Sequence, residues 1–121
     1  MKVLLVDDEA DIRRIGELSL HSVGGWDVLL ASSGDEGIEA ARAHRPDLIL
    51  MDMMMPEMDG MSALRQLRAD PELASTPVVF MTAKVQRDEV ARYLEAGAKG
   101  VVHKPFDPMT LPDEIRQILG D

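Results

Sequence analysis

The chain has 121 residues, of which 45% are hydrophobic, so it can bury one core but is too short for two well-packed domains. Its formal net charge of −9 argues against binding to duplex nucleic acid, because such proteins need a basic face for the phosphates. Cysteine is absent, and there is neither a long apolar run nor a signal-peptide pattern. We therefore expect one domain over residues 1–121, cytoplasmic and without membrane insertion.

Short apolar runs alternate with amphipathic segments along the chain. The runs expected to form strands are residues 2–6, 27–31, 48–51, 78–81 and 100–103. The helices expected between and after them cover roughly residues 11–23, 34–44, 61–68, 87–96 and 108–119. In the helix over 87–96, Val90 and Leu94 lie four residues apart and are expected to form its inner stripe. Ser33 with Glu36 fits a capping box at the second helix, and Asp107 with Pro108 predicts a cap with proline at the first position of the last helix.

This order of elements predicts an α/β fold of the (βα)₅ type. Strands that are apolar without alternation, and are separated by helices, indicate a parallel sheet covered on both faces. Right-handed crossovers then make a doubly wound sheet the default arrangement. A closed eight-stranded barrel is excluded, because it needs about 250 residues.

Polar residues that could bind a ligand or take part in a reaction follow four of the five predicted strands. In an open α/β sheet, ligands bind outside the carboxyl ends of the strands. Asp7 and Asp8 end the first strand, Asp52 ends the third, Thr82 the fourth and Lys104 the fifth. If the first and third strands are neighbours, the three aspartates converge.

Three neighbouring carboxylates repel one another unless a cation or a proton compensates. A few carboxylates together with water suit Mg²⁺ better than Ca²⁺. A lysine and a hydroxyl beside them could hold the oxygens of a phosphoryl group. An aspartate between the metal and the lysine could then act as a nucleophile and form an acyl phosphate.

Five segments carry a resemblance to a known family: VLLVDDE at 3–9, LILMDMMMPEMDG at 48–60, VVFMTA at 78–83, LEAGAKG at 94–100 and KPF at 104–106. In order and spacing the chain resembles the receiver (CheY-like) domain of two-component response regulators. The resemblance implies a flavodoxin-like sheet with strand order 2-1-3-4-5. It also implies a regulatory phosphoacceptor domain rather than an enzyme, with at most Mg²⁺-dependent self-phosphorylation from small donors and self-dephosphorylation.

The resemblance also assigns roles to residues. Asp52 would be the phosphoacceptor. Asp8, Asp52 and the backbone carbonyl of Met54 would ligate Mg²⁺ directly, with Asp7 holding the metal through water. Thr82 would hydrogen-bond the phosphoryl oxygen and Lys104 would pair with its charge. The bond between Lys104 and Pro105 is expected to be cis, as it is in the family.

The sequence departs from the family at Val101, where a tyrosine or phenylalanine is usual, so the aromatic half of the usual switch is missing. Lys84 and Met54 are expected to border the site. The other methionines of the loop after Asp52, and Met54 with them, are expected to pack around the acid.

The resemblance implies that a histidine kinase or a histidine phosphotransfer protein supplies the phosphoryl group and that an unidentified protein is the downstream target. Two interpretations of the chain remain open. It is either a stand-alone receiver, which we favour, or a receiver fragment of a larger regulator or hybrid kinase. A Mg²⁺-dependent aspartyl phosphatase is a less favoured alternative, because Met54 stands where that class needs a second aspartate. A flavodoxin-like FMN site is disfavoured by the acids after the first strand.

Overall fold

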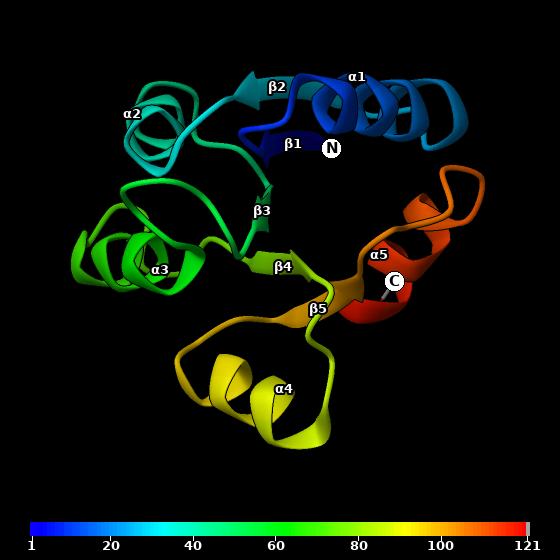
Figure 1. The fold of residues 1–121 in the computed structure, drawn as a ribbon. Helices are drawn as coiled ribbons and strands as arrows, with labels where there is room; N and C mark the ends of the chain where they lie inside the picture. The colour runs from blue at the N-terminus through cyan, green and yellow to red at the C-terminus, as the bar shows by residue number, and fades with distance from the viewer. Residues whose placement is uncertain (121) are drawn as a thin grey trace.

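The computed structural model describes residues 1–120 and shows one parallel sheet between two layers of helices (Figure 1). The strands are β1 (Lys2–Val6), β2 (Asp27–Ala31), β3 (Leu48–Asp52), β4 (Val78–Thr82) and β5 (Gly100–His103). The helices are α1 (Ala10–Leu18), η1 (Ser19–Val23), α2 (Gly34–His44), α3 (Gly60–Ala69), α4 (Arg87–Glu95) and α5 (Leu111–Leu119).

The strand order is β2-β1-β3-β4-β5, with every neighbouring pair parallel, which confirms the expected doubly wound sheet. In the register, Val6 lies beside Met51, so β1 ends only one residue before β3, whose last residue is Asp52. The residues that follow them therefore emerge together at the carboxyl edge of the sheet.

Side chains alternate between the two faces of the sheet, and each face has its own core. Leu4 and Ile49 contribute to the core beneath α2, α3 and α4, whereas Val3 and Leu50 contribute to the core beneath η1 and α5. Because both faces are covered, both sets of alternating positions are apolar. This explains the uninterrupted apolar runs of the sequence. Gly16 lets α1 approach the sheet closely, since a Cβ there would overlap the side chain of Leu5.

The single helix expected over residues 11–23 is two segments. The α-helix ends at Leu18 and is followed by a π-helical turn, in which the amide of Gly24 donates to the carbonyl of Ser19. The Ser19 hydroxyl donates to the carbonyl of Pro108, which connects this turn to the segment before α5.

The start predicted for the last helix is wrong. Asp107 does not cap α5; its carboxylate accepts from the amide of Met109, and its carbonyl accepts from the amides of Thr110 and Leu111. These bonds close a separate turn before the helix. The proline in the first turn of α5 is Pro112, not Pro108.

The cap predicted for α2 is confirmed, since the Ser33 hydroxyl accepts from the amide of Glu36 at 3.1 Å. The Glu36 carboxylate, however, bonds to the backbone amide and the hydroxyl of Ser32 rather than to Ser33.

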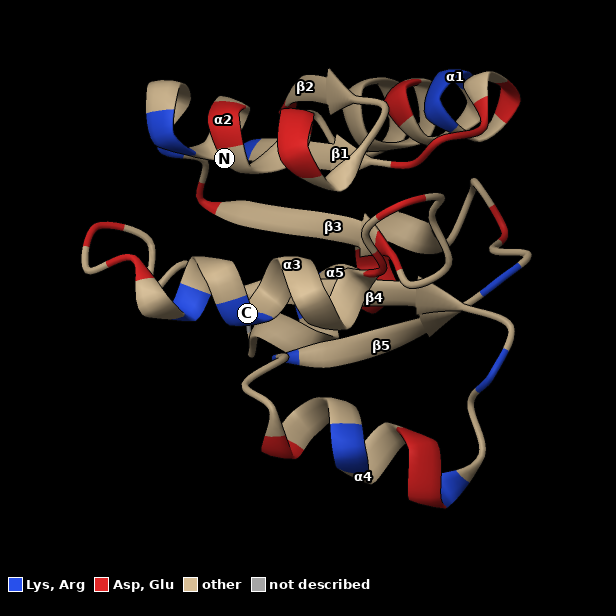
Figure 2. Cartoon of the chain, turned by 60° about the vertical axis from the view of Figure 1, so that its left-hand side comes forward, with Lys and Arg blue, Asp and Glu red and all other residues tan. Residues whose placement is uncertain are grey.

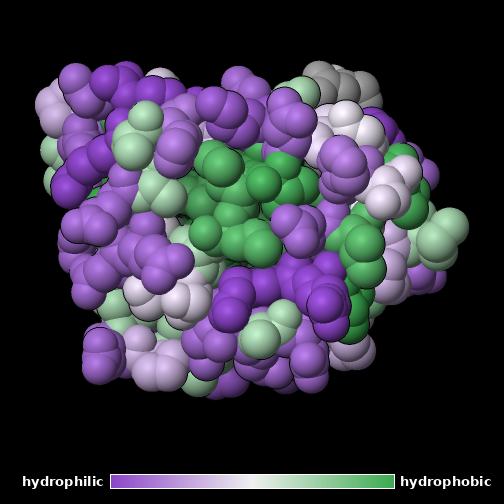
Figure 3. Space-filling model, turned by 90° about the horizontal axis from the view of Figure 1, so that it is seen from above, coloured by the Kyte–Doolittle hydropathy of each residue, from purple (hydrophilic) through white to green (hydrophobic). Residues whose placement is uncertain are grey.

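The edge strand β2 carries an exposed apolar surface. Figure 3 looks onto the side of the molecule that carries β2 between α1 and α2, and a hydrophobic area lies at its centre. Leu30 of β2 is 37% exposed and Leu18 of α1 is 59% exposed. Among residues 1–120, no helix is long and apolar enough to cross a membrane.

Candidate functional site

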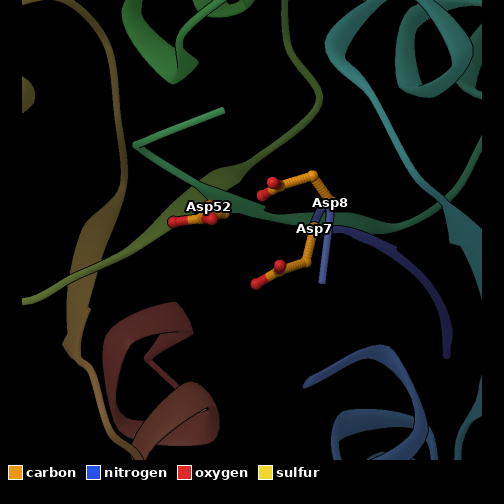
Figure 4. Close-up of side chains that lie close together, drawn as sticks. All are labelled: Asp7, Asp8 and Asp52. Atoms are coloured by element: carbon orange, nitrogen blue, oxygen red, sulfur yellow. The ribbon is translucent and has the colours of Figure 1, made fainter. Parts of the chain in front are cut away.

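The predicted site residues meet at the carboxyl edge of the sheet. Figure 2 shows acidic residues in the loops that follow β1 and β3 at this edge. Asp7, Asp8 and Asp52 each offer a carboxylate oxygen, and these oxygens lie within 4.8 Å of one another (Figure 4). Asp7 and Asp52 are buried, whereas Asp8 is exposed. The convergence expected from the strand ends is therefore present, because β1 and β3 are neighbours.

The Asp52 carboxyl group is held in an environment that disfavours its charge. The residue is only 3% exposed. Burial raises the pKa of Asp52, and the charge of Asp7 raises it further, while Lys104 and the Met54 amide act in the opposite direction. The Met54 amide lies 3.3 Å from the Asp52 carboxylate. The net direction of the pKa shift is upward, because burial and the charge of Asp7 outweigh the contacts with Lys104 and the Met54 amide.

Lys104 is the cation of this cluster. Its Nζ atom lies 3.0 Å from the Asp7 carboxylate and 3.3 Å from that of Asp52, with Glu9 at 3.8 Å. Burial lowers the pKa of Lys104, but the hydrogen bonds and charges of Asp7 and Asp52 outweigh it, so the pKa is raised. The Lys104–Pro105 peptide bond is cis, as expected. One ammonium group therefore connects the ends of β1, β3 and β5.

Thr82 is buried at the end of β4, and its hydroxyl accepts a hydrogen bond from the Lys84 amide at 3.0 Å. This hydrogen bond connects the start of the β4–α4 loop to the end of β4. Asp7 has a comparable local role, since its carboxylate accepts from the amide of Glu9 at 2.8 Å.

The loop after Asp52 is closed by a glycine and packed by methionines. The Gly60 amide donates to the Met53 carbonyl, and a Cβ at Gly60 would lie 2.9 Å from the Phe80 ring and 3.0 Å from the Met53 backbone. Met53 and Met55 are buried, as expected for packing residues. Met54 is not, because its side chain is 64% exposed.

A cavity of about 350 Å³ opens onto the cluster, and its lining includes Asp52, Thr82 and Lys104, together with Met54, Glu9, Ile12, Ala83 and Pro105. Sequence reasoning did not identify Ile12 or Pro105 as lining residues, although Pro105 directly follows the predicted lysine. A slightly larger cavity, about 380 Å³, lies between α1, η1 and the start of β2. Its lining contains none of the predicted site residues, which lie instead at the first cavity.

Comparison with known proteins identifies this arrangement. The family description "Response regulator receiver domain" matches residues 3–116. The chain belongs to the response regulator receiver domain family. It is 36% identical over 118 residues to the alkaline phosphatase synthesis transcriptional regulatory protein PhoP of Bacillus subtilis, a match covering 98% of this chain and 48% of that protein. It is 35% identical over 120 residues to the response regulator Rre1 of Synechocystis, covering 99% of this chain and 52% of Rre1.

Among solved structures, this receiver domain is similar to the chemotaxis response regulator CheY4 of Vibrio cholerae. The TM-score is 0.90, with 31% identity and 97% of each chain covered. The receiver domain spans about half the length of the curated relatives that it matches. These relatives place it in two-component phosphorelay signalling.

Receiver domains generally bind Mg²⁺ at an acidic pocket, and the cluster fits that ion. Carboxylate oxygens are the ligands that Mg²⁺ prefers. The cluster has two buried acids and an exposed one, which leaves a solvent-facing side for the water that the ion retains. Lys104 is the positively charged side chain of the cluster, and its ion pairs with Asp7 and Asp52 keep these two acids together.

One buried residue beside the site was not predicted from the sequence. Val90 and Leu94 defined the expected inner stripe of α4, yet Leu94 is exposed and the buried residue is Tyr93. The spacing of three residues from Val90 to Tyr93 is also helical, so the signal was present in the sequence.

Proposed function

We propose that Asp52 accepts a phosphoryl group from a phosphohistidine of a histidine kinase or a histidine phosphotransfer protein, and that the phosphorylated domain has a changed affinity for a partner protein. The observation that carries the proposal is a nearly fully buried carboxylate at the carboxyl edge of the sheet, placed between two acids and a lysine. Burial of a carboxylate is costly, and such a cost is found mainly where the group performs chemistry.

The transfer conserves atoms and charge in a simple way. A carboxylate oxygen of Asp52 forms a bond to phosphorus while the bond from phosphorus to the donor's imidazole nitrogen breaks. The nitrogen leaves with the electron pair and takes up a proton. The product is an acyl phosphate on Asp52.

The surrounding residues are assigned to binding the transferred group and the metal ion. Lys104, 3.3 Å from the Asp52 carboxylate, is placed to pair with the oxygens of the transferred group. The Thr82 hydroxyl can turn from the Lys84 amide to donate to one of these oxygens. We assign Mg²⁺ to Asp8, Asp52 and the backbone carbonyl of Met54, with Asp7 acting through water. When bound, the ion supplies positive charge that offsets the repulsion among the carboxylates and the phosphoryl oxygens.

The proposal treats the domain as a phosphoacceptor rather than an enzyme that acts on a separate substrate. We further propose that the domain undergoes self-phosphorylation from small donors and self-dephosphorylation. We also propose that residues 1–121 are organised as one domain and that its location is cytoplasmic. An aspartyl phosphatase is not favoured, because Met54, at the position of its second aspartate, presents an exposed apolar side chain.

Acetyl phosphate tests the proposal without knowledge of the kinase. Incubation with acetyl phosphate and Mg²⁺ is expected to give one labile phosphoryl adduct by intact-mass spectrometry. Asp52→Asn is expected to abolish it, whereas Asp47→Asn, at a surface position that precedes β3, is expected to retain it. An undiminished adduct in Asp52→Asn would refute the assignment.

A further inference from the structure

Helix α4 carries an aromatic ring that lines a cavity together with residues of the two loops bordering Asp52. Tyr93 is 3% exposed, and its ring packs edge-on against Phe80 of β4, with 5.6 Å between the ring centroids. Phe80 lies beside Val101 in the register of β4 and β5, and Val101 packs against the same core. The ring above this part of the sheet therefore comes from the helix, while the strand residue is a small valine.

A cavity lies between the Tyr93 ring and the loops of the site. Its volume is about 150 Å³, and Tyr93 lines it together with Met53, Met54 and Lys84. The two methionines directly follow Asp52, and Lys84 comes two residues after Thr82. Its other lining residues are Asp59, Met61, Glu89 and Arg92. A change in either loop therefore changes the space beside the ring.

A hydrogen bond joins the start of the second loop to the end of β4. The Lys84 amide donates to the Thr82 hydroxyl oxygen at 3.0 Å. A phosphoryl group on Asp52 is a strong acceptor with negative charge, so it attracts the Thr82 hydroxyl as a hydrogen-bond donor. When that hydroxyl turns to Asp52, the Lys84 amide loses its acceptor and the loop before α4 is free to move.

We infer that Tyr93 is a positioning residue that transmits occupation of Asp52 to helix α4, with its ring repacking against Phe80 as the Lys84 loop enters or leaves the adjoining cavity. The inference rests on the proposed phosphorylation of Asp52. In this inference Tyr93 of α4 makes the contact that couples the site to the helix. The small side chain of Val101 does not provide such a contact, because a valine has no ring to reposition.

The composition of the chain allows a direct test. Tyr93 is the single tyrosine and Trp26 the single tryptophan. Trp26 immediately precedes β2, at the opposite edge of the sheet, where Arg116 lies over its ring. Protein labelled with 3-fluorotyrosine, and separately with 5-fluorotryptophan, therefore gives one protein fluorine resonance in each sample. The probe is beryllofluoride with Mg²⁺, whose own bound fluorine signals report occupation of Asp52 in the same spectrum.

We expect beryllofluoride to shift the Tyr93 resonance and to leave that of Trp26 in place. Thr82→Val, which keeps the shape of the side chain but removes the hydroxyl, is expected to lose most of the Tyr93 shift at equal occupancy. Thr82→Ser, which retains the hydroxyl, is expected to restore it.

Three results would overturn the inference: bound beryllofluoride with an unchanged Tyr93 resonance, an equal shift at Trp26, or a full Tyr93 shift in Thr82→Val. Failure of beryllofluoride to bind at all would instead contradict the proposed function, and the inference with it.

Discussion

Replacement of Lys104 by methionine tests whether one ammonium group holds the acid cluster together. Methionine has a similar length and no charge, so the variant leaves Asp7 and Asp52 buried without their cation. We expect a large loss of stability at pH 7 in the absence of Mg²⁺. The loss should be partly recovered by Mg²⁺, which supplies the missing positive charge, or by Asp52→Asn, which removes one of the buried negative charges.

The expected size follows from the two distances. At an effective dielectric constant of about 20, ion pairs of 3.0 and 3.3 Å are each worth about 5 kcal/mol of Coulomb energy. Desolvation of the ammonium group offsets much of this. Removal of one partner from a buried ion pair typically costs about 3–5 kcal/mol, and we expect a loss near the lower figure because Lys104 is partly exposed. That is a large part of the total stability of a small domain, which is about 5–15 kcal/mol.

Urea unfolding in EDTA, followed by circular dichroism, measures this loss. Lys99→Met is the matched control, because Lys99 is exposed and lies on the loop between α4 and β5. The reasoning would be refuted if Lys104→Met lost less than about 0.5 kcal/mol, which is the usual size of a surface effect. It would also be refuted if Asp52→Asn made the Lys104→Met protein less stable rather than more.

Three further outcomes follow from the same site. The pKa of Asp52 is raised in the folded protein, so folding favours the protonated form of this residue. The destabilisation that the charged carboxylate causes is therefore absent below about the ordinary value of 3.8, and it grows as pH rises through the folded pKa. Asp52→Asn should therefore stabilise the metal-free protein at pH 7 but not at pH 3.5 in urea unfolding; an equal gap at both would contradict this. Mg²⁺ should raise the melting temperature by binding the native state, and Asp8→Ala should blunt that rise; full retention of the rise would argue against Asp8 as a ligand. Amide chemical-shift mapping with beryllofluoride should show large changes at residues 82–90 and smaller ones at 100–103, because Val101 lacks a ring to swing; the reverse pattern would exclude a response led by the β4–α4 loop.

The sheet was predictable because burial on both faces imposes a strong constraint on composition. In β3 the residues 48–51 are all apolar and buried, so the charged residue that ends the strand, Asp52, is conspicuous. Once the strand order places β1 beside β3, Asp7 and Asp52 come together at the carboxyl edge of the sheet. The identity of the cluster was thus available from the strand ends, whereas the strand order came from the resemblance.

The errors concern elements whose positions depend on contacts between distant segments. The start of α5 was misplaced because Asp107 and Pro108 satisfy the local rules for a helix cap, while the real backbone bonds close a turn first. The inner face of α4 was misjudged because Val90 pairs with Leu94 and with Tyr93 at equally good helical spacings. Only the position of Phe80 beneath the helix decides between them.

The lining of the site was partly predictable for a related reason. Strand-end residues could be read in order along the chain, whereas Ile12 lies in α1, beyond the strand end, and lines the cavity as well. The exposure of Met54 likewise could not be predicted from residue type, because the adjacent Met53 and Met55 carry the same side chain and are buried.

The central claim, that Asp52 carries the phosphoryl group, is tested most directly by locating the acyl phosphate chemically. Borohydride reduces an aspartyl phosphate to homoserine, so treatment of the acetyl phosphate product followed by peptide mass spectrometry marks the modified residue. Homoserine at position 52, dependent on Mg²⁺ and absent at Asp7 and Asp8, is the predicted result. Homoserine at Asp7 or Asp8 with an unmodified Asp52, or an adduct retained on a histidine, would contradict the account.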